Sequence, residues 1–233
     1  MSIKNLGESD SVLEKIKYKT LKKRPMEIFI ANKTHTIYAQ IICDTIAEAA
    51  KVRGTGIAKR KPEYIEQKML NKNAVIALDG NKFAGFCYIE QWGHGKFVAN
   101  SGLIVHPDYR GTGLSKKIKE VIFKHSRTKF PDAKVFSITT GLPVMKLNSN
   151  LGYKPVTFSE LTDDQTFWDG CKTCVNYDVL TRTNRKMCLC TGMLFDPKNN
   201  KNKDSKNIKE ATFKRLKNIK HNLFLKKDKK WKN

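Results

Sequence analysis

The feature of this sequence that most constrains its fold is a glycine-rich loop between a predicted strand and a predicted helix. Residues 97–105 have the composition of a strand that stops at His106-Pro107-Asp108, and an amphipathic helix begins at Leu114. Such a loop can direct several backbone N–H groups at a pyrophosphate, and the dipole of the following helix adds to the attraction. The loop is Arg110-Gly111-Thr112-Gly113-Leu114-Ser115. Its glycines permit close backbone approach and positive φ, and its arginine adds a fixed cation, so the sequence predicts a phosphate site.

The segment around this loop resembles the coenzyme-binding strand and loop of the GNAT superfamily of N-acetyltransferases. The family pattern Arg/Gln-x-x-Gly-x-Gly/Ala is met except at its last place, where the small residue Ser115 stands. A second family motif ends in Leu151-Gly152-Tyr153-Lys154-Pro155, and the resemblance covers roughly residues 26–158. It implies that acetyl-CoA, or another acyl-CoA, is the co-substrate. It also implies that the loop holds the coenzyme pyrophosphate and that the strand residues Leu103, Ile104 and Val105 hydrogen-bond the pantetheine.

An earlier hexamer, Arg53-Gly54-Thr55-Gly56-Ile57-Ala58, fits the six-residue pattern even better. It follows a predicted helix instead of a strand and runs into a basic, proline-containing stretch, so we assign the coenzyme to the later loop. In GNAT folds the connection between the first two helices borders the acceptor site. The resemblance therefore makes Arg53 and Arg60 candidates for binding an acceptor carboxylate, with a solvated basic loop as the alternative.

The order of predicted elements gives an α/β domain with a mixed sheet flanked by helices, as in GNAT proteins. Expected strands lie at 26–31, 74–78, 83–89, 97–105, 134–140 and 153–158, and Asp79-Gly80 predicts a hairpin between the second and third. A first helix is expected after the capping residues Asn32 and Thr34, and it should end near residue 52. Further helices are expected at 62–70, 114–130 and 143–151. We expect four segments: a basic lead-in 1–25, an acyltransferase domain 26–158, a cysteine-containing extension 159–197, and a basic tail 198–233 with an amphipathic helix.

Candidates for proton transfer are fewer than the resemblance would suggest. Many family members carry a tyrosine acid four residues before the glycine of the second motif, but Asn148 stands at that place. Asparagine cannot donate as an acid, so the thiolate leaves with hydrogen-bond help or another residue serves. For the base, Glu90 and His94 lie near the strand that precedes the coenzyme strand. The alternative for both is an ordinary residue at the rim of the site.

Four cysteines follow the predicted catalytic domain as two close pairs. Cys171-x-x-Cys174 is separated by thirteen residues from Cys188-x-Cys190, which approaches the spacing of a zinc ribbon. We predict a structural zinc site on these four ligands, with 176–180 as an intervening strand. The alternative is four reduced, partly buried thiols.

The composition bears on partners and location. The net charge of +23 is spread along the chain, since residues 201–233 carry only +10 of it, and lysine dominates without interleaved aromatic residues. This pattern argues against specific nucleic-acid binding. The sequence contains no apolar run of transmembrane length and no signal-peptide core near its start, so we expect a cytoplasmic protein without a membrane partner.

The expected function is transfer of an acetyl or succinyl group from acyl-CoA to a primary amine of a small molecule. The segment 158–171, together with the loop 53–60, resembles stand-alone bacterial acyltransferases of the first step of arginine synthesis, which implies the α-amine of glutamate as acceptor. One alternative is a protein N-acetyltransferase whose basic tail docks its target. Another is a non-catalytic module that binds acyl-CoA or nucleic acid.

Overall fold

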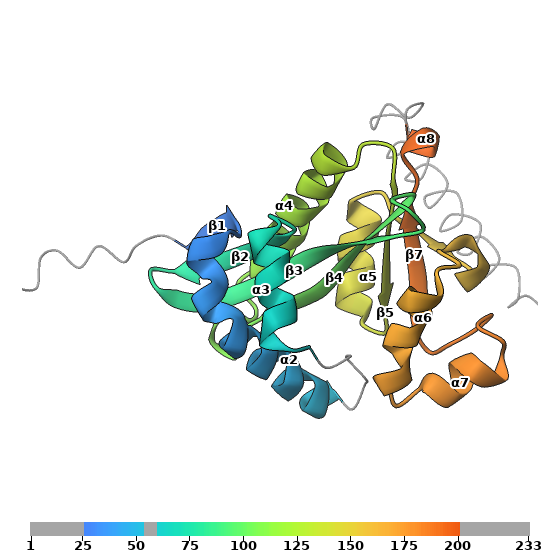
Figure 1. Cartoon of the computed structure of the whole chain (residues 1–233), viewed down its shortest axis with the longest axis horizontal. Coiled ribbons are helices and arrows are strands. Elements are labelled where there is room, and N and C mark those ends of the chain that lie inside the picture. The colour runs from blue at the N-terminus through green and yellow to red at the C-terminus, as the bar shows by residue number, and fades with distance from the viewer. Residues whose placement is uncertain (1–25, 54–59, 201–233) are drawn as a thin grey trace, which may run out of the picture. The chain divides into compact units, whose positions relative to one another are not determined.

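The computed structural model describes residues 26–53 and 60–200, with the side chains of Arg53 and Asn200 left out. The chain forms a mixed sheet whose strands follow the order β1-β2-β3-β4-β5-β7-β6 (Figure 1). Its strands are β1 (Glu27–Ile30), β2 (Ala74–Asp79), β3 (Lys82–Trp92), β4 (Phe97–Val105), β5 (Lys134–Thr139), β6 (Lys154–Val156) and β7 (Thr191–Phe195). The β4–β5 pair is parallel, whereas β1–β2, β2–β3, β5–β7 and β6–β7 are antiparallel. The predicted α/β fold class is confirmed.

The helices occupy the connections where the sequence predicts them, and further helices lie after β6. The α-helices are α2 (Ala39–Arg53), α3 (Pro62–Leu70), α4 (Leu114–Lys129), α5 (Leu142–Asn150), α6 (Gln165–Asp169), α7 (Tyr177–Arg182) and α8 (Pro197–Asn200). The 3-10 helices are η1 (Lys33–Tyr38), η2 (Pro107–Tyr109), η3 (Phe158–Glu160) and η4 (Gly170–Thr173). Within the described ranges, no helix is both long and apolar enough to cross a membrane.

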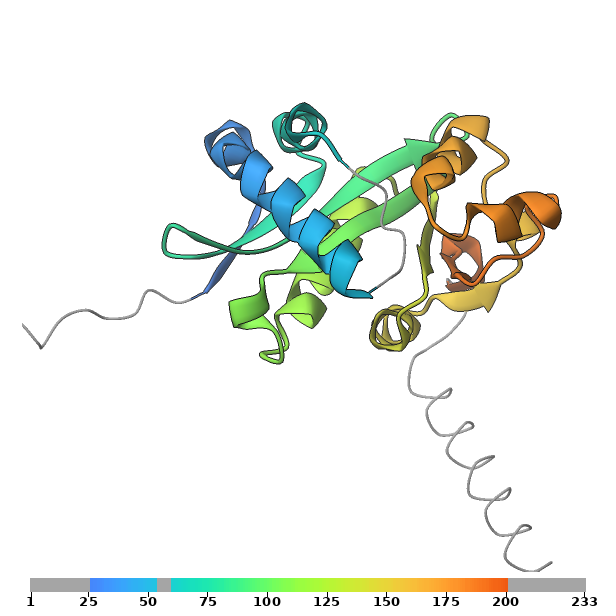
Figure 2. The same cartoon turned by 90° about the horizontal axis from the view of Figure 1, so that it is seen from below.

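The described residues divide into two compact units. The first comprises 26–53, 60–90, 100–123 and 173–175, and the second comprises 91–99, 124–172 and 176–200. In the first unit α2 and α3 cover one face of β2 and β3, while the start of α4 lies on the opposite face (Figure 2). The core between these helices and the strands contains Ile42, Ile65, Met69, Ile76 and Phe86, each fully buried.

Local sequence signals explain where the first helices begin. The side chain of Asn32 accepts a hydrogen bond from the N–H of Thr34 at 2.9 Å, and its own N–H donates to His35 Nδ1 at 3.1 Å. This reciprocal cap satisfies N–H groups that would otherwise lack a partner at the start of η1. Pro62 begins α3, where the missing N–H of proline costs nothing. The hairpin at Asp79-Gly80 forms as predicted, with Gly80 at φ 60°.

The first unit requires two glycines where backbones pack most closely. A Cβ on Gly85 of β3 would lie 2.5 Å from Ile118 Cδ1 of α4 and 3.0 Å from the carbonyl oxygen of Ile104. A Cβ on Gly102 of β4 would lie 2.2 Å from Cε1 of Tyr88, and Gly102 has φ 63°. The ring of Tyr88 therefore lies directly against the backbone of β4, which only glycine allows.

A polar contact also joins α4 to β4. Lys119 is 1% exposed, and its Nζ lies 3.5 Å from Oδ1 of the buried Asn100. Burial lowers the pKa of Lys119 to about 8, because the charged form loses hydration there. This amide oxygen offsets part of the cost of burying the lysine.

In the second unit, β7 lies between β5 and β6. Val135 of β5 pairs with Phe195 of β7, and Lys154 of β6 pairs with Leu194. Phe136, Phe158, Trp168 and Leu180 are buried in a common aromatic cluster beside these strands. The cysteine-containing segment thus supplies a strand of the sheet as well as the helices α6 and α7.

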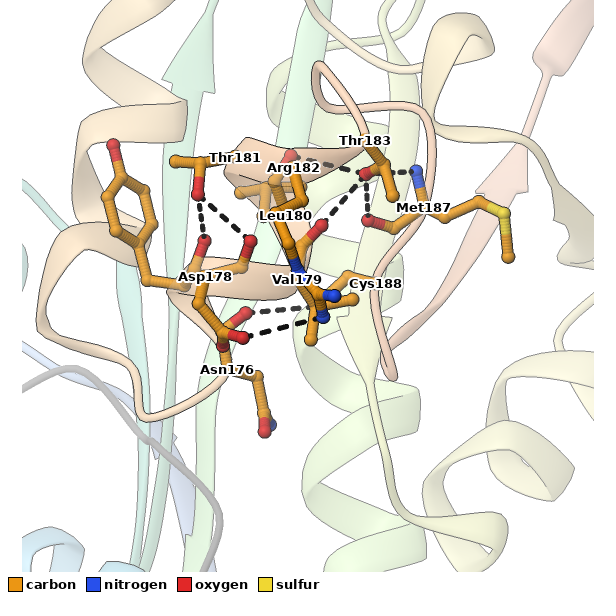
Figure 3. Close-up of polar contacts among 10 residues, drawn as sticks. Asn176, Asp178, Val179, Leu180, Thr181, Arg182, Thr183, Met187 and Cys188 are labelled. Atoms are coloured by element: carbon orange, nitrogen blue, oxygen red, sulfur yellow. Dashed lines mark hydrogen bonds and ion pairs between the residues drawn. The ribbon is translucent and has the colours of Figure 1, made fainter.

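The expected strand at 176–180 is wrong, because this segment starts the helix α7. The hydroxyl of Thr183 lies within hydrogen-bond distance of the carbonyl oxygens of Val179 (2.9 Å), Leu180 (3.2 Å) and Met187 (2.8 Å), as Figure 3 shows. It also accepts a bond from the N–H of Met187 at 3.2 Å. One side chain therefore ends the helix and holds the returning loop.

The contact between Tyr88 and Gly102 gives the first prediction. Gly102→Ala should lower the free energy of unfolding by about 1–3 kcal/mol more than Gly80→Ala, because only the former drives a Cβ into a rigid ring. Gly80 is a matched control, since its φ is 60° and a Cβ there meets no heavy atom of the described residues within 4 Å. Denaturant unfolding of both variants measures the difference, and equal losses would contradict the packing role of Gly102.

Candidate functional site

The predicted phosphate loop connects β4 to α4 through the short helix η2. Gly111 has φ 77° and Gly113 has φ 79°, a backbone conformation that favours glycine. A Cβ added to either residue would meet no heavy atom of the described part of the chain within 4 Å. These glycines are therefore not needed for internal packing, and they leave the backbone of the loop open to a ligand.

Three hydrogen bonds fix the loop to its surroundings. The hydroxyl of Tyr109 donates to Asp79 Oδ2 at 3.2 Å, and that of Thr112 donates to the carbonyl oxygen of Tyr109 at 2.7 Å. Arg110 Nε donates to the carbonyl oxygen of Val105 at 3.3 Å, which directs the side chain of the exposed arginine toward the end of β4. The loop is thus held between the end of β4 and the β2–β3 hairpin.

The start of α4 has the electrostatics of an anion site. Its first turn contains no acidic residue, and Lys116 and Lys117 are exposed there. The N–H groups of both lysines point to the carbonyl oxygen of Gly113, at 3.1 Å and 3.4 Å. The helix dipole adds positive potential at this end, so the loop can bind a pyrophosphate through backbone N–H groups and nearby cations.

Gly113→Asp should weaken coenzyme A binding at least about tenfold, because the new side chain places a negative charge where the phosphate would lie. Gly95→Asp is a matched control, since Gly95 has φ 82° and open space within the described residues, in a turn away from the loop. Calorimetric titration with coenzyme A compares the two variants. Equal weakening in both, or in neither, would be inconsistent with a coenzyme site at the loop.

A second polar group of side chains forms where α3 lies against β3. Glu90 is 8% exposed, and one of its carboxylate oxygens, Oε1, accepts a hydrogen bond from the hydroxyl of Tyr64. Lys68 Nζ lies 3.8 Å from the same oxygen. Arg60 Nε donates to the hydroxyl of the buried Tyr88 at 2.8 Å. We call these five residues the α3–β3 cluster.

Opposing effects set the ionisation of this cluster. Burial raises the pKa of Glu90, while the charge of Arg60 and a hydrogen bond from the Ser101 side chain lower it. Burial, together with the neighbouring charge of Arg60, lowers the pKa of Lys68 to about 8. A buried carboxylate whose pKa is moved toward neutrality is suited to accept a proton from an attacking amine.

The structure brings some of the predicted site residues together and leaves others apart. It brings Glu90 and Arg60 into one cluster. His94 lies in the exposed turn after β3 with φ 55°. Asn148 is 0% exposed in α5, where its Nδ2 lies 3.6 Å from Met193 Sδ. Arg53 is the last residue of α2, and its side chain, like the hexamer that it begins, lies outside what the structure describes.

Sequence reasoning missed Tyr64, Lys68 and Tyr88 as members of the site. Lys68 follows Tyr64 by four residues, so the two side chains fall on the same face of the helix. Tyr88 and Glu90 are two residues apart on β3, so they lie on one face of the strand, within its buried stretch. The signal in the sequence that could have predicted the cluster is the carboxylate of Glu90 on a mostly apolar strand, together with Lys68 on a neighbouring helix.

The predicted zinc site is not supported. Within the described ranges, which include all six cysteines, no group of three or more His, Cys, Asp or Glu side chains could hold a metal ion, and no disulfide forms. Cys171, Cys188 and Cys190 instead pack against the aromatic cluster of the second unit. The helix α7 separates the two pairs where a ribbon would need a strand, so the thiols do not converge.

Residues 43–143 match the family model described as the Acetyltransferase (GNAT) family. The matched segment runs from α2 to the start of α5 and contains the loop and the α3–β3 cluster. This segment, 101 of the 233 residues, is similar to that family. The match supports the predicted acyl-coenzyme A dependent N-acyltransferase activity. No curated protein matches the sequence.

Solved structures with the same fold include several acetyltransferases. N-acetylglutamate synthase from Neisseria gonorrhoeae, complexed with coenzyme A and N-acetyl-glutamate, gives a TM-score of 0.52 at 14% identity, over 75% of this chain and 36% of that one. Rv2747 from Mycobacterium tuberculosis, in complex with CoA and NLQ, gives a TM-score of 0.52 at 14% identity, and the match covers 73% of this chain and 98% of that one. An acetyltransferase from Streptococcus agalactiae gives a TM-score of 0.52 at 19% identity, and the match covers 74% of this chain and 99% of that one. The chain therefore spans about a third of the Neisseria synthase and nearly all of the other two.

Proposed function

We propose that the protein transfers an acetyl or succinyl group from acyl-CoA to the α-amine of a small amino acid, and that glutamate is its best candidate acceptor. The observation that carries this proposal is the α3–β3 cluster, in which the buried carboxylate of Glu90 pairs with Lys68 and lies in the field of Arg60, in the same unit as the loop 110–115. The carboxylate suits proton removal from an amine, and the cations suit an acceptor that carries its own carboxylates. This reaction would be the first step of arginine synthesis.

In this proposal the coenzyme is held by main-chain groups. The loop from Arg110 to Ser115 would bind the pyrophosphate, and Lys116 and Lys117 would add positive potential. The backbone of Leu103, Ile104 and Val105 would hydrogen-bond the pantetheine. Support comes from the positive φ of both loop glycines and from the anchoring of the loop to Asp79, since a preformed loop loses little entropy on binding.

Glu90 is the proposed base. The acceptor's ammonium must lose a proton before its nitrogen can attack the thioester carbonyl, and Glu90 would take that proton, directly or through one water. The C–N bond then forms and the C–S bond breaks, with the electron pair leaving on sulfur. A thiol titrates near pH 8.5, so a thiolate can leave without a dedicated acid. Asn148 is fully buried against Met193, which argues against its contact with the leaving group.

Arg60 and Arg53 are the proposed ligands of the acceptor's carboxylates. Arg60 is held in place by Tyr88, and its guanidinium carbon lies 5.6 Å from the centre of the Tyr64 ring, so its charge is fixed beside Glu90. Support also comes from the Neisseria synthase, whose solved complex contains N-acetyl-glutamate. Its 14% identity to this chain shows the fold alone, so the acceptor needs a direct test.

The test is a screen of the purified protein with acetyl-CoA and succinyl-CoA against free amino acids, a polyamine and a lysine-containing peptide, following thiol release. Thiol release with glutamate, and little with the polyamine, is the expected outcome. Glu90→Gln should lower kcat by about 10²–10⁴-fold, because the proton acceptor is removed. Transfer to the peptide without transfer to any amino acid would overturn the proposal in favour of a protein acetyltransferase.

Arg60→Leu should raise the acceptor KM by about 10- to 100-fold while leaving coenzyme affinity close to normal, since a charge-assisted pair contributes about 1.5–3 kcal/mol. Arg182→Leu is the control, because Arg182 forms an exposed ion pair with Asp178 in the second unit. Steady-state kinetics separates the two variants. An unchanged acceptor KM in Arg60→Leu would remove Arg60 from the acceptor site.

A further inference from the structure

Two side chains of α3 converge on one oxygen of Glu90. Tyr64 and Lys68 are four residues apart on the helix, so both project from the same face. The hydroxyl of Tyr64 donates to Glu90 Oε1, and Lys68 Nζ lies 3.8 Å from that atom. Both partners of the ion pair are largely buried, with side-chain exposures of 19% for Lys68 and 9% for Glu90. An ion pair in this setting is screened much less by solvent than one on the surface.

The ammonium group of Lys68 is confined by aromatic rings. Its Nζ lies 4.6 Å from the centre of the Tyr64 ring and 5.7 Å from that of Tyr88. The two rings meet edge to face, with centroids 5.9 Å apart. Attraction of a cation to the ring faces favours this position, and it holds the charge beside Glu90.

We propose that Lys68 is a positioning residue that, together with Tyr64, keeps the carboxylate of Glu90 ionised and fixes its orientation for proton transfer. This inference rests on the proposed role of Glu90 as base. It adds a residue that would act through Glu90 and not on the substrate. Its physical basis is that a buried carboxyl group prefers its neutral form unless cations and donors stabilise the charge.

The groups that face Glu90 come from four parts of the chain. Arg60 precedes α3, Tyr64 and Lys68 lie on it, Tyr88 lies on β3, and Ser101 lies on β4. Cys43 of α2 lies close enough to Arg60 and Tyr88 for the charge of its thiolate form to raise the pKa of both residues. Two of these groups are cations. Arg60 donates its Nε hydrogen to Tyr88, whereas Lys68 approaches the carboxylate itself.

The charge of Lys68 is itself sensitive to pH. Burial and the charge of Arg60 lower the pKa of Lys68 to about 8, from an ordinary value of 10.5. The lysine is therefore mostly protonated at pH 7 and loses its charge above about pH 8. An arginine at this position would keep its charge throughout, which provides a direct comparison.

The experiment is a ¹³C NMR titration of the Glu90 carboxyl group in the full-length protein, with its signal assigned by its loss in Glu90→Gln. Lys68→Met should raise the pKa of Glu90 by about one pH unit or more, and Lys68→Arg should leave it near the wild-type value. Lys68→Gln gives the same test if the methionine variant fails to fold. Lys51→Met, which removes an exposed ion pair with Glu48, is the control and should not move the titration.

The kinetic consequence is a shift of the acidic limb of kcat/KM by the same amount in Lys68→Met, with recovery at higher pH. A purely structural role of Lys68 would lower activity equally at every pH. An unchanged Glu90 titration in Lys68→Met would overturn the inference. A shifted titration without acyl transfer to any amino acid would contradict the proposed acceptor instead, and it would leave the coupling of Lys68 to Glu90 in place.

Discussion

The ring of Tyr88 lies against the bare backbone of Gly102, and the arrangement of the candidate site depends on this contact. A side chain at position 102 would occupy the space of the ring, since a Cβ there would lie 2.2 Å from it. With the ring in place, the hydroxyl of Tyr88 accepts the hydrogen bond from Arg60, and the rings of Tyr88 and Tyr64 pack edge to face. The same strand, β4, then leads to the coenzyme loop. One glycine thus links the placement of the cluster to the strand that precedes the loop.

The site combines two opposite electrostatic environments within the first unit. The loop and the first turn of α4 offer exposed positive potential, since Gly111, Gly113, Lys116 and Lys117 are exposed and the turn contains no acidic residue. The α3–β3 cluster is largely buried, and its single carboxylate is paired with Lys68 and lies in the field of Arg60. An exposed anion site suits a coenzyme that must enter and leave, whereas a buried carboxylate suits a base whose pKa must be raised.

The features predictable from the sequence were those encoded locally. The strand, loop and helix from Phe97 to Lys129 follow from residue periodicity and from two closely spaced glycines, and they form as expected. The Tyr88–Gly102 contact could not be predicted in this way, because it depends on how β3 lies against β4. The strand β7 was missed for a related reason: it pairs with β5 and β6, which are distant in sequence, and it follows a segment dominated by cysteines. The zinc prediction failed because the spacing of cysteines does not determine whether their sulfur atoms converge.

The proposed function depends most directly on binding of the coenzyme pyrophosphate by the loop from Arg110 to Ser115. Amide hydrogen exchange, measured with and without coenzyme A, tests it directly, because N–H groups bonded to phosphate exchange more slowly. Slowed exchange is expected in peptides that cover 110–117, with little change in peptides that cover the earlier hexamer at 53–58. Slowed exchange at 53–58 without any change at 110–117 would contradict it.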